Sequence, residues 1–276
     1  MIFFVISFYQ EAKPLIEHFK LQKILSSKFE IFSNNQIFLI LTREGIIRSS
    51  IGTTFLLTRF SAQEKDMAIN LGICGAKNRN FQKGDIILCH KIINHYTKKA
   101  FYPDIIVNHD MKEGVLESFM IPVKKDIKEE IEGDIVDMEG AGFFESASFF
   151  LPPHNIHCIK IVYDFLDYEK IKKEEISNLI YHHIPKIEKF IYSLLELNKY
   201  EKLPFEEENI KDMVEKLKES LNLTFSMTHE LEKYLKGYII RKGNIPKEIF
   251  DFINIKANSK KERKEYFERI KKLLSP

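Results

Sequence analysis

The sequence predicts an α/β layer fold with a mainly parallel sheet, followed by a small all-helical unit. Over the first 200 residues, strand-like runs alternate with helix-like runs, which is the pattern of consecutive βαβ units. Several strand-like runs are apolar without interruption, as in strands that are buried on both faces of a sheet. After residue 206 no strand-like run appears. A chain of 276 residues has room for one large domain and a small second one.

Five runs of residues carry the strand prediction. They are residues 2–8, 36–42, 67–72, 84–89 and 158–163. Each is rich in isoleucine, valine, leucine or phenylalanine, residues that suit a buried strand. We expect the third strand to end in a glycine-containing turn at residues 72–75, because two glycines stand there.

Four further runs are predicted to be helices. They are residues 10–21, 49–60, 140–150 and 170–197. In the last run the buried side of the helix is marked by Ile176, Leu179, Ile180, His183, Ile187, Ile191 and Leu194. This spacing matches the helical period of 3.6 residues and predicts one face packed on the sheet.

A domain boundary is predicted at residues 198–206, which are polar and include a proline at position 204. We therefore expect a first domain over residues 1–197, a linker over 198–206 and a helical extension over 207–276. The first helix of the extension is indicated by the apolar positions Ile210, Met213, Val214, Leu217 and Leu221.

Three more helices are expected in the extension. Ser226 can cap the second, which Gly237 would end. Pro246 suits the first turn of a short third helix. Ser259 and Glu262 have the spacing of a capping box that opens the fourth.

Composition excludes several classes of partner. The net charge is +2, so nothing calls for nucleic acid or an anionic membrane, and the basic residues after position 260 alternate with glutamates as on a solvated helix face. Cys74, Cys89 and Cys158 form no CxxC pair and suggest buried thiols in a reducing cytoplasm. The apolar start is too short for a signal peptide or a membrane span. The histidines lack metal-ligand spacing, so we expect neither a metal nor a cofactor.

Four groups of polar or glycine residues fall where the strands are expected to end. They are Glu11, residues 72–76, the pair Asp137 and Glu139, and Asp164. Ligands bind beyond the carboxyl ends of strands in open α/β sheets, so these groups are candidates for one site. Taken singly, each carboxylate is more often a helix-end charge and each glycine more often a turn residue.

Asp137 and Glu139 stand two residues apart, directly before the helix-like run at 140–150. Two carboxylates at this spacing can accept hydrogen bonds from the two hydroxyls of a vicinal diol. Sugars offer such diols. The pair therefore indicates a ribose site, with a solvated turn as the alternative.

Four pieces of the chain, in order, resemble the nucleoside phosphorylase and nucleosidase superfamily, closest in pattern to its methylthioadenosine/S-adenosylhomocysteine nucleosidases. Residues 5–15 resemble the opening strand with its glutamate, and residues 69–86 the central glycine segment and the next strand. Residues 136–141 resemble the ribose-binding segment, and residues 161–164 the strand with a base-protonating aspartate. The resemblance covers about residues 1–197. It implies a three-layer α/β/α fold with a mixed, largely parallel central sheet.

The resemblance also implies roles for single residues. Glu139, with the Met138 backbone and with Asp137 at the ribose edge, would hold the ribose hydroxyls. Asp164 would protonate the purine N7 as the glycosidic bond breaks, and Glu11 would position or deprotonate a water. Further substrate contacts are implied at Gly75, Lys160 and Arg48. The expected substrate is a small-molecule purine nucleoside or a related compound, and the expected assembly is a homo-oligomer.

The chain departs from the family pattern in ways that bear on the reaction. Ile73 stands where the family has a serine, and Asn70 where bacterial phosphorylases have an arginine. Neither side chain replaces the lost phosphate contact, so hydrolysis is favoured over phosphorolysis. Lys160 replaces an arginine and keeps the charge without the bidentate fork. Arg48 follows an altered Ser-Gly-Ile-Gly segment and can offer a second cation.

The base-binding region, between His95 and Val136, is shorter than in typical nucleosidases. Phe101, Tyr102 and Phe119 are candidate stacking rings, although such rings are more often core residues. Two alternatives to a nucleosidase therefore stay open. One is a catalytically weakened ligand-binding or scaffold protein of the same fold, and the other is a phosphate-dependent phosphorylase.

Overall fold

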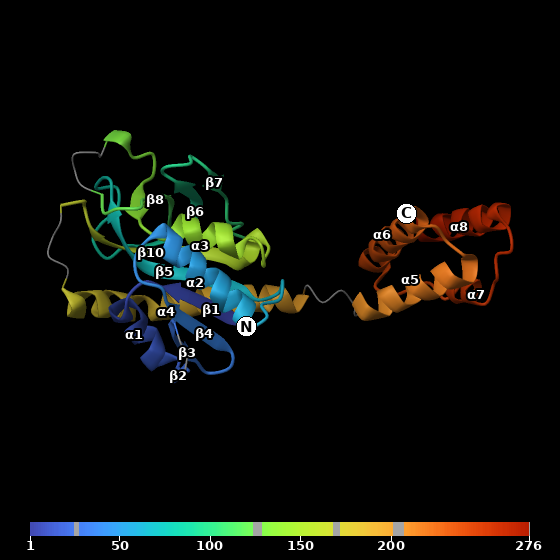
Figure 1. Cartoon of the computed structure of the whole chain (residues 1–276), viewed down its shortest axis with the longest axis horizontal. Helices are drawn as coiled ribbons and strands as arrows, with labels where there is room; N and C mark the ends of the chain where they lie inside the picture. Colours follow the sequence, from blue (N-terminus) through green and yellow to red (C-terminus); the bar gives the residue numbers. More distant parts are fainter. Residues whose placement is uncertain (25–27, 124–128, 168–171, 201–206, 276) are drawn as a thin grey trace. The chain divides into compact units, whose positions relative to one another are not determined.

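The chain consists of two compact units, Met1–Leu195 and Glu196–Pro276, in a computed structural model (Figure 1). The structure describes residues 1–24, 28–123, 129–167, 172–200 and 207–275. The candidate residues at positions 11 to 164 all belong to the first unit.

The first unit is built on one mixed sheet with the strand order β10-β6-β8-β9-β5-β1-β4-β3-β2, and β7 pairs with β6. The strands are β1 (Ile2–Ile6), β2 (Gln22–Ile24), β3 (Glu30–Ser33), β4 (Ile37–Leu41), β5 (Met67–Ala76), β6 (Ile86–Asn94), β7 (Ala100–Phe101), β8 (Lys112–Ser118), β9 (Ile135–Asp137) and β10 (Ile156–Asp164). The neighbours β4, β1, β5 and β10 all run parallel. Because β10 also pairs with β6, the strands β5, β10, β6, β8 and β9 close into a ring.

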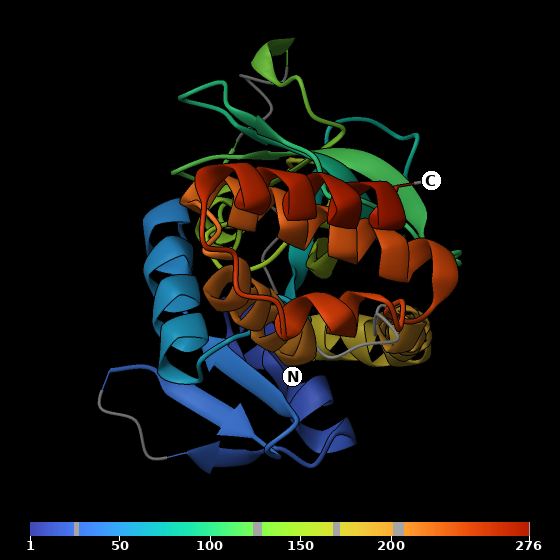
Figure 2. The same ribbon diagram turned by 90° about the vertical axis from the view of Figure 1, so that its right-hand side faces the viewer.

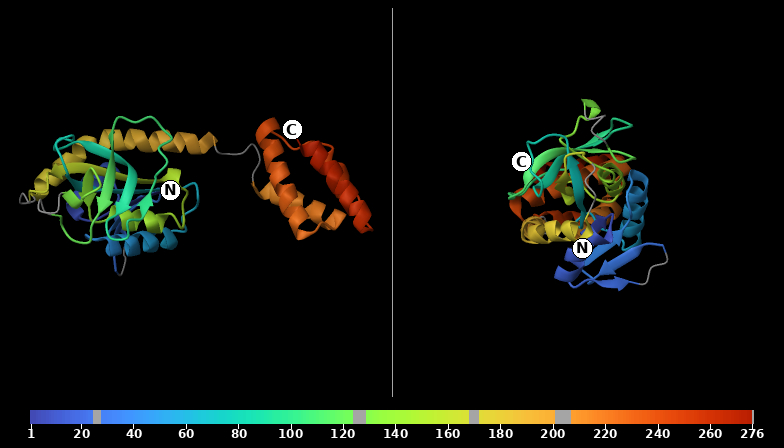
Figure 3. Two further views of the ribbon diagram at one scale, coloured as in Figure 1. Left: turned by 90° about the horizontal axis from the view of Figure 1, so that it is seen from above. Right: turned by 90° about the vertical axis from the view of Figure 1, so that its left-hand side faces the viewer.

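Helices cover both faces of this sheet, which gives three layers. The helices α1 (Tyr9–His18) and α4 (Lys173–Tyr200) pack on the face that carries Phe4, whereas α2 (Ile46–Arg59) and α3 (Gly140–Ala147) pack on the face that carries Val5. Successive side chains of a strand point to opposite faces, so β1 supplies both cores. The left view of Figure 3 shows the strands lying between α4 and α2.

The predicted three-layer α/β fold with a mixed, largely parallel sheet is confirmed, with one local correction. The turn expected at residues 72–75 does not form, because β5 continues to Ala76. Gly72 and Gly75 instead pair with Lys160 and Asp164 of β10. Glycine serves close packing here rather than a turn.

Five strands escaped the sequence analysis: β2, β3, β7, β8 and β9. Three of them have two or three residues, and β8 reads Lys-Glu-Gly-Val-Leu-Glu-Ser, which is too polar to signal a buried strand. Its last three residues are nevertheless buried, because β8 lies between β6 and β9.

The second unit contains α5 (Glu207–Leu221), α6 (Phe225–Lys242), α7 (Ile249–Ile253) and α8 (Lys260–Leu274), which pack on one another (Figure 2). It has a hydrophobic core of its own, which includes Leu217, Leu231, Leu235 and Ile270. The expected all-helical C-terminal unit is confirmed.

Helix ends in this unit differ from those predicted. Thr224, not Ser226, caps α6, and its hydroxyl accepts a hydrogen bond from the Met227 N–H. Gly237 lies inside α6, which ends at Gly243 with a positive φ of 77°. Pro246 precedes α7 instead of opening it.

The start of α8 follows the prediction in part. Ser259 Oγ accepts a hydrogen bond from the Glu262 N–H at 3.2 Å. The Glu262 carboxylate accepts from the Asn258 N–H at 2.8 Å, one residue before the position that a capping box requires. Across the described ranges, no helix is both long enough and apolar enough to cross a membrane.

Candidate functional site

Glu11 lies in the first turn of α1, directly after β1, and its side chain points into the protein. Only 3% of the residue is exposed. One carboxylate oxygen accepts from the Phe8 N–H at 3.0 Å, and the other accepts from the Ile73 N–H of β5 at 2.9 Å. A Cβ atom at Gly72 would lie 2.9 Å from Glu11 Oε1, so only glycine lets the carboxylate approach the strand this closely.

Asp137 ends β9 and forms a buried ion pair with Lys160 of β10. The Lys160 Nζ lies 2.7 Å from Asp137 Oδ2, and both side chains are 1% exposed. The remaining bonds of Asp137 come from the Ser118 hydroxyl at 2.5 Å and the Gly140 N–H at 2.8 Å. The carboxylate is therefore fully engaged in holding β8, β9, β10 and α3 together.

Glu139 stands at the N-cap of α3, where two backbone N–H groups fix it. Its Oε1 accepts from the Gly45 N–H at 3.0 Å, and its Oε2 accepts from the Met138 N–H at 3.3 Å. Gly45 precedes α2 with a φ of 114°, which other residues rarely adopt. Glu139 is buried, but Met138 is partly exposed, so solvent reaches the edge of this site.

Glu11, Asp137, Glu139 and Lys160 act on one another electrostatically. Burial raises the pKa of Glu139 to about 7, the negative charges of Asp137 and Glu11 raise it as well, and Lys160 opposes the rise. Burial also raises the pKa of Glu11, against the N–H groups of Ile73 and Phe8 and the charge of Lys160.

Lys160 behaves in the opposite way. Burial alone would lower the pKa of its ammonium, but the charges of Asp137 and Glu139 raise that pKa above its ordinary value. Lys160 therefore stays charged and offsets part of the negative charge of three carboxylates. Of these carboxylates, Glu139 changes its protonation near neutral pH.

Asp164 lies at the end of β10 and pairs with Gly75 of β5. Gly75 is three positions after Gly72, the partner of Lys160. The pairing of β10 with β5 is irregular between Val162 and Asp164, and this bulge turns Asp164 toward Gly75. Asp164 Oδ1 accepts from the Leu166 N–H at 2.9 Å and would lie 3.1 Å from a Cβ atom at Gly75. Asp164 and Gly75 are partly exposed. Asp164 therefore flanks the buried cluster rather than belonging to it.

The other predicted contacts are less well supported by their positions. Arg48 is exposed in the first turn of α2. Among the candidate rings, Phe101 and Phe119 are buried, and Tyr102 is 61% exposed. Asn70 is buried and donates to the Val5 carbonyl at 2.9 Å, so its amide serves the sheet.

Ser118 and Gly45 are site residues that the sequence analysis missed. Ser118 Oγ donates to Asp137 and accepts from the Ala141 N–H at 2.9 Å, which links the ribose-site candidate to the first turn of α3. The polar sequence of β8 gave no sign that it ends there. Gly45 did have a local signal, because glycine is a common residue at the N-cap of a helix and α2 begins at Ile46.

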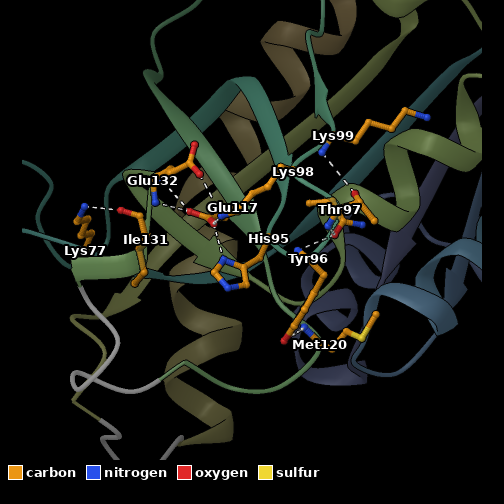
Figure 4. A network of polar contacts seen from close by, with 12 residues as sticks. Lys77, His95, Tyr96, Thr97, Lys98, Lys99, Glu117, Met120, Ile131 and Glu132 are labelled. Atoms are coloured by element: carbon orange, nitrogen blue, oxygen red, sulfur yellow. Dashed lines mark hydrogen bonds and ion pairs between the residues drawn. The ribbon is translucent and has the colours of Figure 1, made fainter.

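Another buried carboxylate, that of Glu117, lies next to Ser118 at this end of β8 (Figure 4). Glu117 is fully buried and accepts from the Glu132 N–H at 2.6 Å and the Gly133 N–H at 2.9 Å, and its Oε1 lies 2.6 Å from His95 Nδ1. Burial raises the pKa of Glu117, but the hydrogen bonds from the Gly133 N–H, His95 and the Glu132 N–H outweigh burial and hold that pKa below its usual value. The His95 ring stacks on Phe119 with their centroids 4.0 Å apart.

Within the described residues, no group of three or more His, Cys, Asp or Glu side chains is arranged to hold a metal ion. The carboxylates of the cluster face an ammonium and backbone N–H groups instead. Because a carboxylate oxygen can accept more than one hydrogen bond, Glu11 and Glu139 can still accept from the hydroxyl groups of a ligand.

No protein-family profile matches the sequence, and no curated protein matches it. Solved structures do match. The 5'-methylthioadenosine/S-adenosylhomocysteine nucleosidase from Helicobacter pylori aligns with a TM-score of 0.58 and 17% identity, covering 71% of this chain and 97% of that chain.

Two further structures match to a similar extent. The futalosine hydrolase of Helicobacter pylori aligns with a TM-score of 0.55 and 18% identity, covering 71% of this chain and 97% of that chain. The Arabidopsis thaliana 5'-methylthioadenosine nucleosidase aligns with a TM-score of 0.60 and 19% identity, covering 70% of this chain and 95% of that chain. The chain therefore has the fold that these nucleosidases share.

Replacing Lys160 with methionine is expected to destabilise the protein by about 3–5 kcal/mol, because Asp137 would keep a buried charge without a partner. Chemical denaturation checks this. The matched control is Lys189→Met, which breaks an exposed ion pair with Asp110 and should change stability little. Equal losses in the two variants would show that the buried pair has no special weight.

The pKa of Glu139 predicts a pH-dependent effect of Glu139→Gln. The folded wild-type protein keeps the proton on Glu139 up to about pH 7, whereas the unfolded chain releases it near pH 4.5. The stability from this group is complete below pH 4.5 and is lost as pH rises through 7. Glutamine does not titrate. The melting temperature of the variant, relative to wild type, should therefore rise between pH 5 and pH 8; a constant difference would refute the raised pKa.

Proposed function

We propose that the protein is a nucleosidase-type hydrolase that cleaves the N-ribosidic bond of a purine nucleoside or a related compound. The observation that carries the proposal is the convergence of Glu11 after β1, Glu139 after β9 and the Asp137–Lys160 pair, which joins the end of β9 to the middle of β10. The fold shared with known nucleosidases supports it.

The sugar end of the reaction falls to Glu139. Its carboxylate accepts hydrogen bonds from the ribose hydroxyls, and the half-buried Met138 lies beside it. When the glycosidic bond breaks, positive charge develops on the ribose ring. A carboxylate held by the Gly45 and Met138 N–H groups stabilises that charge without rearranging, because its position is fixed before the reaction.

Glu11 favours water over phosphate as the nucleophile. The Ile73 N–H, a backbone donor that could cradle an oxyanion, already donates to Glu11 Oε1. An incoming phosphate would meet this carboxylate instead of a donor, and Ile73 has no side-chain hydroxyl to replace it. The raised pKa of Glu11 suits a base that accepts a proton from water.

Asp164 is assigned to the leaving group. It donates a proton to the base as the bond breaks, so that the base departs without a negative charge. The Leu166 N–H donates to Asp164 Oδ1 and so fixes the orientation of this carboxyl at the end of β10. The proposal includes a cytoplasmic location, in keeping with the free thiols of Cys74, Cys89 and Cys158, and a homo-oligomeric assembly, which the resemblance implies.

Incubation with a panel of nucleosides, with and without phosphate, tests the reaction. We expect release of free base and free ribose from at least one purine compound, at a rate that phosphate leaves unchanged. Ribose phosphate as the product would identify a phosphorylase. If no compound releases its base, the protein is a binding or scaffold module of this fold.

Replacing Asp164 with asparagine should lower kcat about 10²–10⁴-fold, the usual weight of a general acid. The asparagine oxygen can still accept from the Leu166 N–H, so folding should be spared. Asp167→Asn is the matched control, since Asp167 accepts from Phe165 in the same turn. Full activity of Asp164→Asn, or equal loss in the control, would remove Asp164 from the mechanism.

A further inference from the structure

Leu166 has a backbone conformation that leucine rarely adopts. Its φ is 66°, in the left-handed region, and its side chain is only 5% exposed. The turn that imposes this conformation is fixed by the bond from the Leu166 N–H to Asp164 Oδ1. The chain thus turns back at Asp164 and directs the next leucine inward.

Three side chains converge on the α-carbon of Gly75. A Cβ atom there would lie 2.7 Å from Leu166 Cδ2, 3.1 Å from Asp164 Oδ1 and 3.3 Å from Val136 Cγ2. Leu166 and Val136 belong to one small buried cluster with Phe119, Val123 and Ile131. The Asp164 carboxyl therefore lies beside Leu166 and Val136, two members of this apolar cluster.

A base that takes a proton from Asp164 has to lie within hydrogen-bond distance of its carboxyl, and its ring has to pack on these apolar side chains. Leu166 projects into that region from the same turn that holds Asp164. We infer that Leu166 is a specificity-determining residue that sets the room for the base beside Asp164 and limits the binding of two-ring bases. This inference rests on the proposed function.

Shortening Leu166 to alanine should therefore favour the larger base. The measured quantity is the ratio of kcat/KM for adenosine to that for 1-ribosylimidazole, which keeps the five-membered ring of a purine and lacks the fused second ring. We expect Leu166→Ala to raise this ratio about tenfold or more, the usual effect of a changed apolar contact, mainly through a lower KM for adenosine.

Ile131→Ala is the matched control. Ile131 is 2% exposed and belongs to the same cluster, but it is not one of the three side chains that converge on Gly75. It should lower stability without moving the ratio. An unchanged or lowered ratio in Leu166→Ala, or the same rise in Ile131→Ala, would overturn the inference.

Leu166→Gly provides a second variant for the same ratio of kcat/KM values, because glycine adopts a positive φ without strain.

If the wild-type protein cleaves neither substrate, the proposed function fails, and calorimetric binding of free adenine then decides the role of Leu166. Tighter adenine binding by Leu166→Ala and Leu166→Gly than by wild type supports it. Equal binding, or no binding by any of the three, overturns it.

Discussion

The buried ammonium of Lys160 is the charge on which the candidate site depends. Three carboxylates lie within its electrostatic reach, and uncompensated burial of such a cluster would be very costly. Lys160 reaches them only because β10 pairs with β5 beside β1, which brings residue 160 next to Gly72. The pairing of β10 with β5 therefore both closes the ring of strands and brings Lys160 to the carboxylates.

Backbone N–H groups complete what Lys160 begins. They bind Glu11 at Ile73 and Glu139 at Gly45, so each carboxylate is fixed before any ligand arrives. Fixed acceptors beside a sugar favour a transition state with positive charge on the ring. Glu11 also occupies the Ile73 N–H, and under the proposed function this removes a donor that a phosphate would need and so favours hydrolysis. The raised pKa of Glu139 makes stability depend on pH near 7, and under the proposed function it makes ribose binding depend on pH in the same range.

The sequence carried the parts of this site that depend on local pattern. Buried strands, the helix at residues 140–150 and the carboxylates at their ends could be predicted, because apolar runs and end residues are local signals. The partners of those carboxylates could not. Ser118 ends a polar strand, and the glycine pairing of β5 with β10 joins residues some ninety positions apart. Leu166 gave no signal, since its left-handed φ follows from its bond to Asp164.

The most direct test of a single nucleoside site is a crystal structure with a purine C-nucleoside, whose carbon–carbon glycosidic bond cannot be hydrolysed. The expected complex has the ribose hydroxyls within hydrogen-bond distance of the Glu139 carboxylate and a ring nitrogen of the base at Asp164, with Glu11 facing the anomeric carbon. A ligand bound away from Glu139, or one that reaches Glu139 without reaching Asp164, would contradict a shared site.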